Sequence, residues 1–251
     1  MRIEQVDILR GVGIFLVILY HFFYALYFFG FSNINPNTGF LLIIGRLAAS
    51  IMVFVVGMSL TLSYVNASKT NSFFSLTKKY LFRSLKLFAV AFFISIISYI
   101  FYPEGWIRWG IIHFIALAVF VCSFFARFYY FNLVAGFYSI LFGFLINPIP
   151  TNNFFLFILG FHLPIYSLDY FAFFPWVGLV FLGMYSAKRL YLKKDLIEQT
   201  SQKTTILAKE NNNITSLISK YFILMGQNTL LLYLIHVPIF VSILLFIKKF
   251  L

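Results

Sequence analysis

The chain has 251 residues, of which 62% are hydrophobic and 10% charged, and its mean hydropathy is +0.93. A soluble domain is about 45–50% apolar and about 25% charged, so this composition excludes an ordinary water-soluble globule and a disordered chain. The 19 Lys and Arg residues against 7 Asp and Glu give a net charge of +12. In a chain this apolar, the excess first indicates membrane orientation, and we expect no nucleic-acid partner.

Long apolar runs, broken by charged or turn residues, predict about seven membrane-spanning helices. They lie near residues 8–30, 40–65, 80–101, 108–127, 130–147, 172–188 and 224–247. The runs are too long for the alternating strands of about ten residues in a membrane β-barrel. The expected fold is therefore all-α, a polytopic transmembrane helix bundle forming a single domain over residues 1–251.

The segment 153–166 is apolar but short, and it contains Gly160, His162 and Pro164. Its length favours a re-entrant or interfacial segment over a full crossing. With seven spans and a cytoplasmic N-terminus, 15 basic residues lie inside and 4 outside, whereas an eighth crossing would give 10 and 9. The positive-inside rule therefore favours seven spans in the cell membrane, with the C-terminus outside. The polar segment near 189–219 is expected to be a mobile cytoplasmic loop.

Ionisable side chains inside the apolar runs are the candidate functional residues, because a charge at mid-bilayer costs at least about 2.5 kcal/mol. One buried histidine is often a neutral imidazole bonded to a carbonyl or hydroxyl. Several ionisable groups at similar depth on different helices are better explained by a functional cluster. In the seven-span arrangement such groups gather toward the outer side: His21, His113, His162, Asp169 and Arg46, with His236 nearer mid-membrane.

The sequence offers little for a metal site. No pair of His or carboxylate residues has ligand spacing on one helix, and the single cysteine, Cys122, is best explained by packing. On the cytoplasmic side, Arg83 and Lys86 are three residues apart on one helix face and could hold phosphate groups. The nearby Lys78 and Lys79 are better explained by contact with anionic lipid headgroups.

Several motifs resemble one family along nearly the whole chain. In order, they are Val6-Asp7-Ile8-Leu9-Arg10-Gly11-Val12 with His21 eleven residues after Arg10, Phe54–Leu60, Arg83–Lys86, Gly110–Phe114, Asp169-Tyr170 with Phe174–Gly178, and Gly226–His236. This order resembles the transmembrane acyltransferases, and most of all the prokaryotic members of the heparan-alpha-glucosaminide N-acetyltransferase catalytic-domain family. That family often has an acidic residue four positions after the first-helix histidine, where this chain has Ala25.

The resemblance implies an enzyme that passes an acyl group, by default acetyl, from cytoplasmic acyl-CoA to an amine or hydroxyl of a sugar or glycan on the outer side. Acyl-CoA would be a co-substrate, with no permanently bound cofactor or metal. A direct transfer and an acyl-histidine intermediate both remain open. The expected roles are general base for His21, orientation of His21 or His113 by Asp169, binding of substrate or oxyanion by Arg46, Trp176, Asn228 and His236, and binding of CoA by Arg10, Arg83 and Lys86.

Two other functions fit the same residues less well. A proton-coupled transporter or flippase could use a relay of His and Asp, although the chain shows no inverted repeat. A non-catalytic scaffold would leave the intramembrane ionisable groups without a role. The expected partners are membrane lipids and a sugar or glycan acceptor, and a homodimer is possible.

Overall fold

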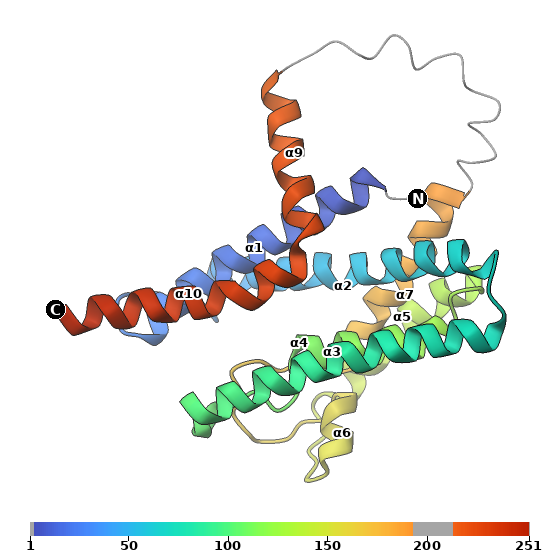
Figure 1. The fold of residues 1–251 in the computed structure, drawn as a ribbon. Helices are drawn as coiled ribbons and strands as arrows, with labels where there is room; N and C mark the ends of the chain where they lie inside the picture. The colour runs from blue at the N-terminus through green and yellow to red at the C-terminus, as the bar shows by residue number, and fades with distance from the viewer. Residues whose placement is uncertain (1–2, 193–212, 251) are drawn as a thin grey trace. The chain divides into compact units, whose positions relative to one another are not determined.

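A computed structural model describes residues 3–192 and 213–250 of the chain (Figure 1). The described part is all-α, as expected, with a 3-10 turn at Pro103–Gly105 and a π-helical turn at Lys188–Leu192. Its nine α-helices are α1 Glu4–Phe28, α2 Gly39–Ser68, α3 Phe73–Phe101, α4 Ile111–Ser123, α5 Tyr129–Ile146, α6 Phe154–Leu159, α7 Trp176–Ala187, α9 Asn213–Gln227 and α10 Thr229–Phe250.

Five of these helices, α1, α2, α3, α5 and α10, are long and apolar enough to cross a membrane. The shortest, α5, has 18 residues, and at 1.5 Å per residue it is about 27 Å long. Two further predicted spans correspond to shorter helices, the 13-residue α4 and the 12-residue α7. The chain is therefore an integral membrane protein, and the segment predicted to be re-entrant contains only the six-residue α6.

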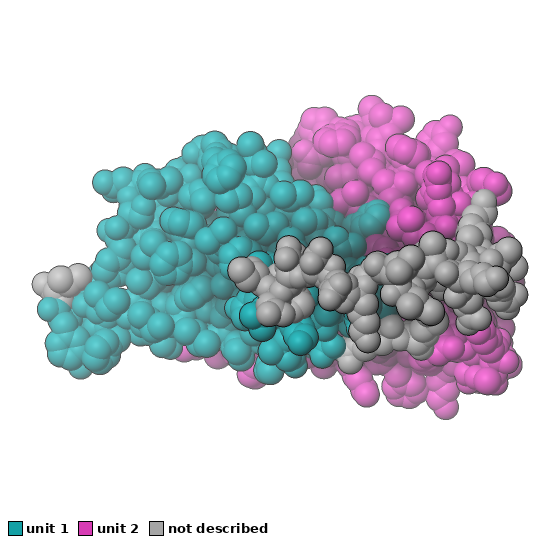
Figure 2. Space-filling view, turned by 90° about the horizontal axis from the view of Figure 1, so that it is seen from above, with its two compact units in different colours: residues 1–55, 202–251 teal, residues 56–201 magenta. Residues whose placement is uncertain are grey.

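The described residues form two compact units, coloured separately in Figure 2. Unit 1 contains residues 1–55 and 202–251, and unit 2 contains residues 56–201. The boundary lies inside α2, so the first part of this helix belongs to unit 1 and the last part to unit 2.

In unit 1, α1 and α10 lie side by side and run in the same direction, while α9 crosses α1 near its N-terminal end (Figure 1). The crossing is tight because both helices have glycine there. A Cβ atom on Gly11 would overlap the Phe222 carbonyl, and one on Gly226 would overlap the Asp7 carbonyl. Small residues let helix backbones approach closely in membranes, where packing drives association. The buried apolar core beside this crossing contains Ile14, Val17, Ala48 and Met225.

In unit 2, glycines again bring helix backbones together. Gly136 of α5 and Gly178 of α7 face each other's backbone, and Gly57 of α2 lies against the Val180 carbonyl of α7. A buried hydroxyl joins α3 to α4, since Ser84 Oγ donates to the Ala116 carbonyl oxygen at 2.7 Å. The exposed faces of α3 and α5 are rich in Phe, Leu and Ile, as expected of surfaces that contact lipid.

Three predicted boundaries differ from the structure. The predicted span 224–247 is divided at Asn228 between α9 and α10, because Gly226 and Asn228 are typical of a helix end. The predicted connector 189–219 is helical at its end, where α9 begins at Asn213, and its residues 193–212 lie outside the described part. Finally, α3 begins at Phe73 because the Ser72 hydroxyl caps the helix by accepting from Ser75 N–H.

Candidate functional site

Two histidines on adjacent helices of unit 1 are in ring contact. His21 lies seven residues before the end of α1, and His236 lies seven residues after the start of α10. Their ring centroids are 4.9 Å apart and the ring planes meet at 63°. His236 is buried and His21 is half-buried. The parallel course of α1 and α10 therefore unites two residues that are 215 positions apart in the chain.

Backbone carbonyls fix the tautomer of both imidazoles. His21 Nδ1 lies 2.9 Å from the Val17 carbonyl oxygen, and His236 Nδ1 lies 2.7 Å from that of Tyr233 and 3.1 Å from that of Leu232. A carbonyl oxygen can only accept, so Nδ1 carries the proton in each neutral ring. Each Nε2 is then left with a lone pair. Among the described residues, the buried Nε2 of His236 has no hydrogen-bond partner.

Aromatic side chains surround this histidine pair. Tyr20 packs edge-on against His21 with centroids 5.5 Å apart, and Tyr233 and Phe240 lie 5.5 and 6.0 Å from His236. The Tyr20 hydroxyl donates to Asn37 Oδ1 at 3.2 Å. These rings cover part of the surface of both imidazoles and lower the local polarity, which strengthens electrostatic interactions there.

Arg46 lies near the level of the histidine pair on α2. Its neighbour Gly45 packs against the Tyr20 ring, since a Cβ on Gly45 would lie 2.8 Å from that ring. Tyr20 precedes His21 directly, so Arg46 and His21 lie on neighbouring helices within unit 1. The Arg46 side chain is exposed.

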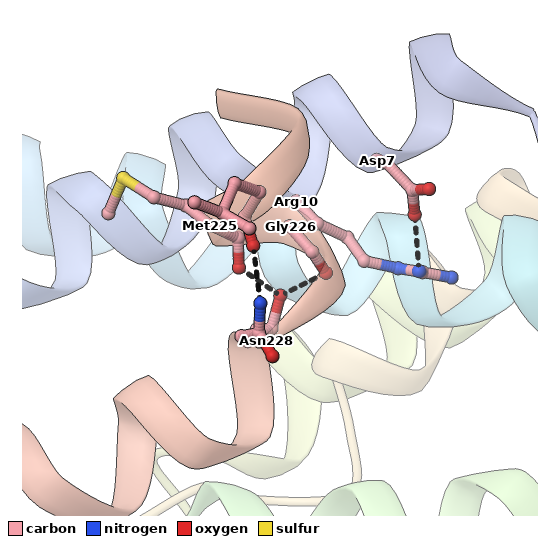
Figure 3. Close-up of polar contacts among 7 residues, drawn as sticks. Asp7, Arg10, Met225, Gly226 and Asn228 are labelled. Atoms are coloured by element: carbon pink, nitrogen blue, oxygen red, sulfur yellow. Dashed lines mark hydrogen bonds and ion pairs between the residues drawn. The ribbon is translucent and has the colours of Figure 1, made fainter. Parts of the chain in front are cut away.

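Arg10 and Asn228, two other predicted site residues, lie where α1, α9 and α10 meet (Figure 3). Arg10 Nη1 donates to Asp7 Oδ1 at 2.8 Å, and Asp7 is buried. The Asn228 side chain donates to the Leu224 carbonyl at 2.9 Å, and its backbone carbonyl accepts from Leu232 N–H. Both side chains therefore have structural partners, with Arg10 balancing a buried carboxylate and Asn228 holding the break between two helices.

In unit 2, Asp169 and His113 hold the start of α4. Asp169 Oδ2 accepts from Ile111 N–H at 2.9 Å, and Gly110 N–H donates to His113 Nδ1 at 3.3 Å. The His113 proton is then on Nε2, which lies 3.4 Å from Ser95 Oγ. Neither ring nitrogen of His113 binds Asp169. Burial raises the pKa of the Asp169 carboxyl to about 6, and the hydrogen bond from Ile111 opposes part of this shift.

The remaining predicted residues of unit 2 lie in separate segments of the chain. Arg83 and Lys86 are exposed on α3, on either side of the buried Ser84. Trp176 is the first residue of α7 and lies 4.5 Å from Phe171 between ring centroids. His162 is exposed, and its backbone pairs with Ile149 and Thr151. No three His, Cys, Asp or Glu side chains come together as a metal site within the described ranges.

The site chemistry follows from the histidine pair. A neutral imidazole with a free Nε2 can accept a proton, and a second imidazole beside it can share that proton. The sequence analysis identified both histidines but assigned them separate roles. Their contact was not predictable, because it depends on how α10 packs along α1. The aromatic walls from Tyr20 and Tyr233 were missed, since such residues are common in this chain and carry no distinctive spacing.

The fold and site define an integral membrane protein with two imidazoles in ring contact on adjacent helices. The chain matches the family model described as heparan-alpha-glucosaminide N-acetyltransferase, catalytic, over residues 2–238. It belongs to this family, which confirms the resemblance found in the sequence and implies an acetyltransferase-type activity. No curated protein matches the chain, and no solved structure matches it.

Proposed function

We propose that this protein transfers an acyl group, acetyl by default, from cytoplasmic acyl-CoA to an amine or hydroxyl of a sugar or glycan on the outer side. The proposal depends above all on the contact between His21 and His236, whose anchored Nδ1 atoms leave Nε2 as the proton acceptor of each ring. Family membership supplies the class of reaction, and acetyl-CoA would be its co-substrate.

In the proposed reaction, His21 Nε2 removes the proton of the acceptor N–H or O–H. The acceptor atom attacks the thioester carbonyl carbon and forms a tetrahedral oxyanion. Collapse of this intermediate breaks the carbon–sulfur bond, and the imidazolium returns the proton to the CoA thiolate. The products are the acylated acceptor and free CoA thiol. General base catalysis of this kind typically contributes about 10²–10⁴-fold to the rate.

His236 is the proposed partner of the imidazolium. The chain has Ala25 where the family often has an acidic residue, so a carboxylate on α1 is missing from that position. The buried Nε2 lone pair of His236 could accept a hydrogen bond from protonated His21. This assigns to His236 the orienting role that the sequence analysis gave to Asp169, whose Oδ2 caps α4.

The charges of unit 2 support the proposed orientation. Helices α2, α4 and α7 end, and α3 and α5 begin, at one end of this unit, as shown by contacts such as Phe73 with Phe124 and Tyr129 with Tyr185. The described residues there are basic without a carboxylate: Lys69, Lys78, Lys79, Arg127, Lys188 and Arg189. This end is the proposed cytoplasmic end, and Arg83 and Lys86 on α3 are the proposed contacts for CoA phosphates.

Purified protein supplied with acetyl-CoA and a panel of amino sugars and glycans tests the proposal, with released CoA thiol as the readout. His21→Ala should lower thiol release by about 10²–10⁴-fold while CoA binding persists. The matched control is His162→Ala, because His162 is an exposed histidine outside the helices. Full activity of His21→Ala would refute the assignment of the base. No thiol release with any acceptor would refute acyl transfer and favour transport.

A further inference from the structure

A compact group of basic residues, distinct from the predicted CoA contacts, lies at the basic end of unit 2. Arg127 lies in the turn between α4 and α5, and Lys188 and Arg189 begin the π-helical turn after α7. The Lys188 ammonium donates to the Arg127 backbone carbonyl oxygen at 2.6 Å. This bond holds the end of α7 against the α4–α5 turn, so the backbone segments that carry the three cations of this basic corner lie side by side.

Aromatic rings form the base of the basic corner. The Arg127 guanidinium lies 4.6 Å from the centre of the Phe128 ring. Arg189 interacts electrostatically with Tyr129, whose ring stacks on Tyr185 with centroids 4.5 Å apart and planes at 23°. Arginine over an aromatic face is partly oriented before any ligand arrives, which lowers the entropic cost of binding.

No carboxylate of residues 3–192 or 213–250 pairs with the basic corner. Lys188 is partly withdrawn from water, which lowers the pKa of its ammonium. An anion bound beside these groups would compensate their positive charge. Phosphate suits them because guanidinium groups bind its oxygens through paired hydrogen bonds.

The surface beside the basic corner is apolar. In the π-helical turn, Leu190 is 53% exposed. On α5, Phe131, Val134 and Tyr138 are 46%, 52% and 68% exposed. The exposed residues of α5 thus form an apolar strip that begins at the basic corner and follows the helix axis. A ligand with a phosphate head and hydrocarbon tails matches this combination, whereas a soluble nucleotide would leave the strip uncovered.

We propose that the basic corner binds the phosphate of an anionic phospholipid, with the acyl chains lying along the exposed face of α5. The site is distinct from the histidine pair, so it would persist if the proposed acyl transfer proved wrong. Bound lipid would stabilise the α4–α5 turn and the end of α7 in the position that the Lys188 hydrogen bond gives them.

The full-length parent protein and its variants are released from nanodiscs of mixed phosphatidylglycerol and phosphatidylcholine. Native mass spectrometry then measures how much of each lipid stays bound to each protein. The variant R127Q/R189Q removes two charges and leaves the Lys188 bond intact. The matched control K248Q/K249Q removes two exposed charges from the last turn of α10. Each basic residue near an anionic surface contributes about fivefold in affinity, so R127Q/R189Q should lower phosphatidylglycerol retention by about 25-fold.

The expected result is preferential retention of phosphatidylglycerol by the parent and by K248Q/K249Q, with loss of that preference in R127Q/R189Q. Equal retention of the two lipids by the parent would overturn the proposal, as would equal losses in both variants. Displacement of the lipid by adenosine 3′,5′-bisphosphate at micromolar concentration would also overturn it and assign the corner to a nucleotide. Size-exclusion profiles of each variant in detergent confirm that the compared proteins are folded.

Discussion

The glycine contacts in α1 predict opposite outcomes for two substitutions that lie two residues apart. A Cβ on Gly11 would lie 2.7 Å from the Phe222 carbonyl carbon and overlap its oxygen, so only a movement of the α9 backbone could relieve the clash. A Cβ on Gly13 would lie 2.8 Å from Met52 Sδ, which is part of a flexible side chain. Gly11→Ala should therefore be destabilising and Gly13→Ala nearly neutral.

The size of the difference follows from the required movement. Normal carbon–carbon contacts are about 3.5–4.0 Å, so α1 and α9 must separate by about 0.8 Å or more in Gly11→Ala. A gap of about 0.5–1 Å loses a quarter to a half of each dispersion contact of about 0.15 kcal/mol, and one buried side chain of the size of leucine makes about 40 such contacts. If the separation affects this number of contacts, the expected loss is about 1.5–3 kcal/mol. The gain in helix propensity, about 1 kcal/mol, is the same in both variants and cancels in the comparison.

Equilibrium unfolding in mixed micelles of dodecyl maltoside and SDS, followed by far-UV circular dichroism, measures this difference. Gly226→Ala should behave like Gly11→Ala, because its Cβ would overlap the Asp7 carbonyl in the same crossing. Equal unfolding free energies for Gly11→Ala and Gly13→Ala, within about 0.5 kcal/mol, would refute the close backbone contact between α1 and α9.

Three further predictions concern unit 2. Burial raises the Asp169 pKa from 3.8 to about 6, so the contribution of the protonated carboxyl to the free energy of unfolding is fully present below pH 4 and is lost as the pH rises through 6. Thermal unfolding from pH 4 to 7 should show a decline in the free energy of unfolding of up to about 3 kcal/mol that is absent in Asp169→Asn. Identical pH profiles for the two proteins would contradict this prediction. Ser84→Ala should cost about 1 kcal/mol by removing the hydrogen bond to the Ala116 carbonyl, as measured by SDS titration, and an unchanged unfolding free energy would count against that bond. The double variant of Arg83 and Lys86 to Gln should weaken CoA binding at least tenfold in calorimetry without loss of folding, since both side chains are exposed; unchanged affinity would leave these residues as lipid anchors.

Family membership and the histidine pair support different parts of the proposed function, the class of reaction and the base that carries it out. The family match defines a reaction class over residues 2–238. In the proposed mechanism, the contact between His21 and His236 provides the base, because both rings are anchored through Nδ1 and keep the Nε2 lone pair. The thiol-release panel is the experiment that would identify the acceptor.

Some of the predicted site residues make hydrogen bonds or ion pairs that stabilise the fold of this protein. Arg10 pairs with the buried Asp7, and Asp169 and His113 hold the first turn of α4. A buried charge needs a partner and a helix start needs acceptors for its free N–H groups, so polar residues in apolar helices can have a purely local cause. The assigned roles of these residues in catalysis and CoA binding remain predictions.

The sequence by itself determined that this is an all-α membrane protein of the heparan-alpha-glucosaminide N-acetyltransferase catalytic family, because hydropathy and ordered motifs are local properties of the chain. It also identified His21 and His236 as separate candidates. Only the tertiary structure placed these two rings in contact, divided the last predicted span at Asn228, and gathered Arg127, Lys188 and Arg189 into one corner. The physical reason is that the apolar faces of these helices are similar to one another, so hydropathy alone does not determine which helices pack together. Small residues such as Gly11 and Gly226 determine the pairing, because they allow close backbone contact in only a few places.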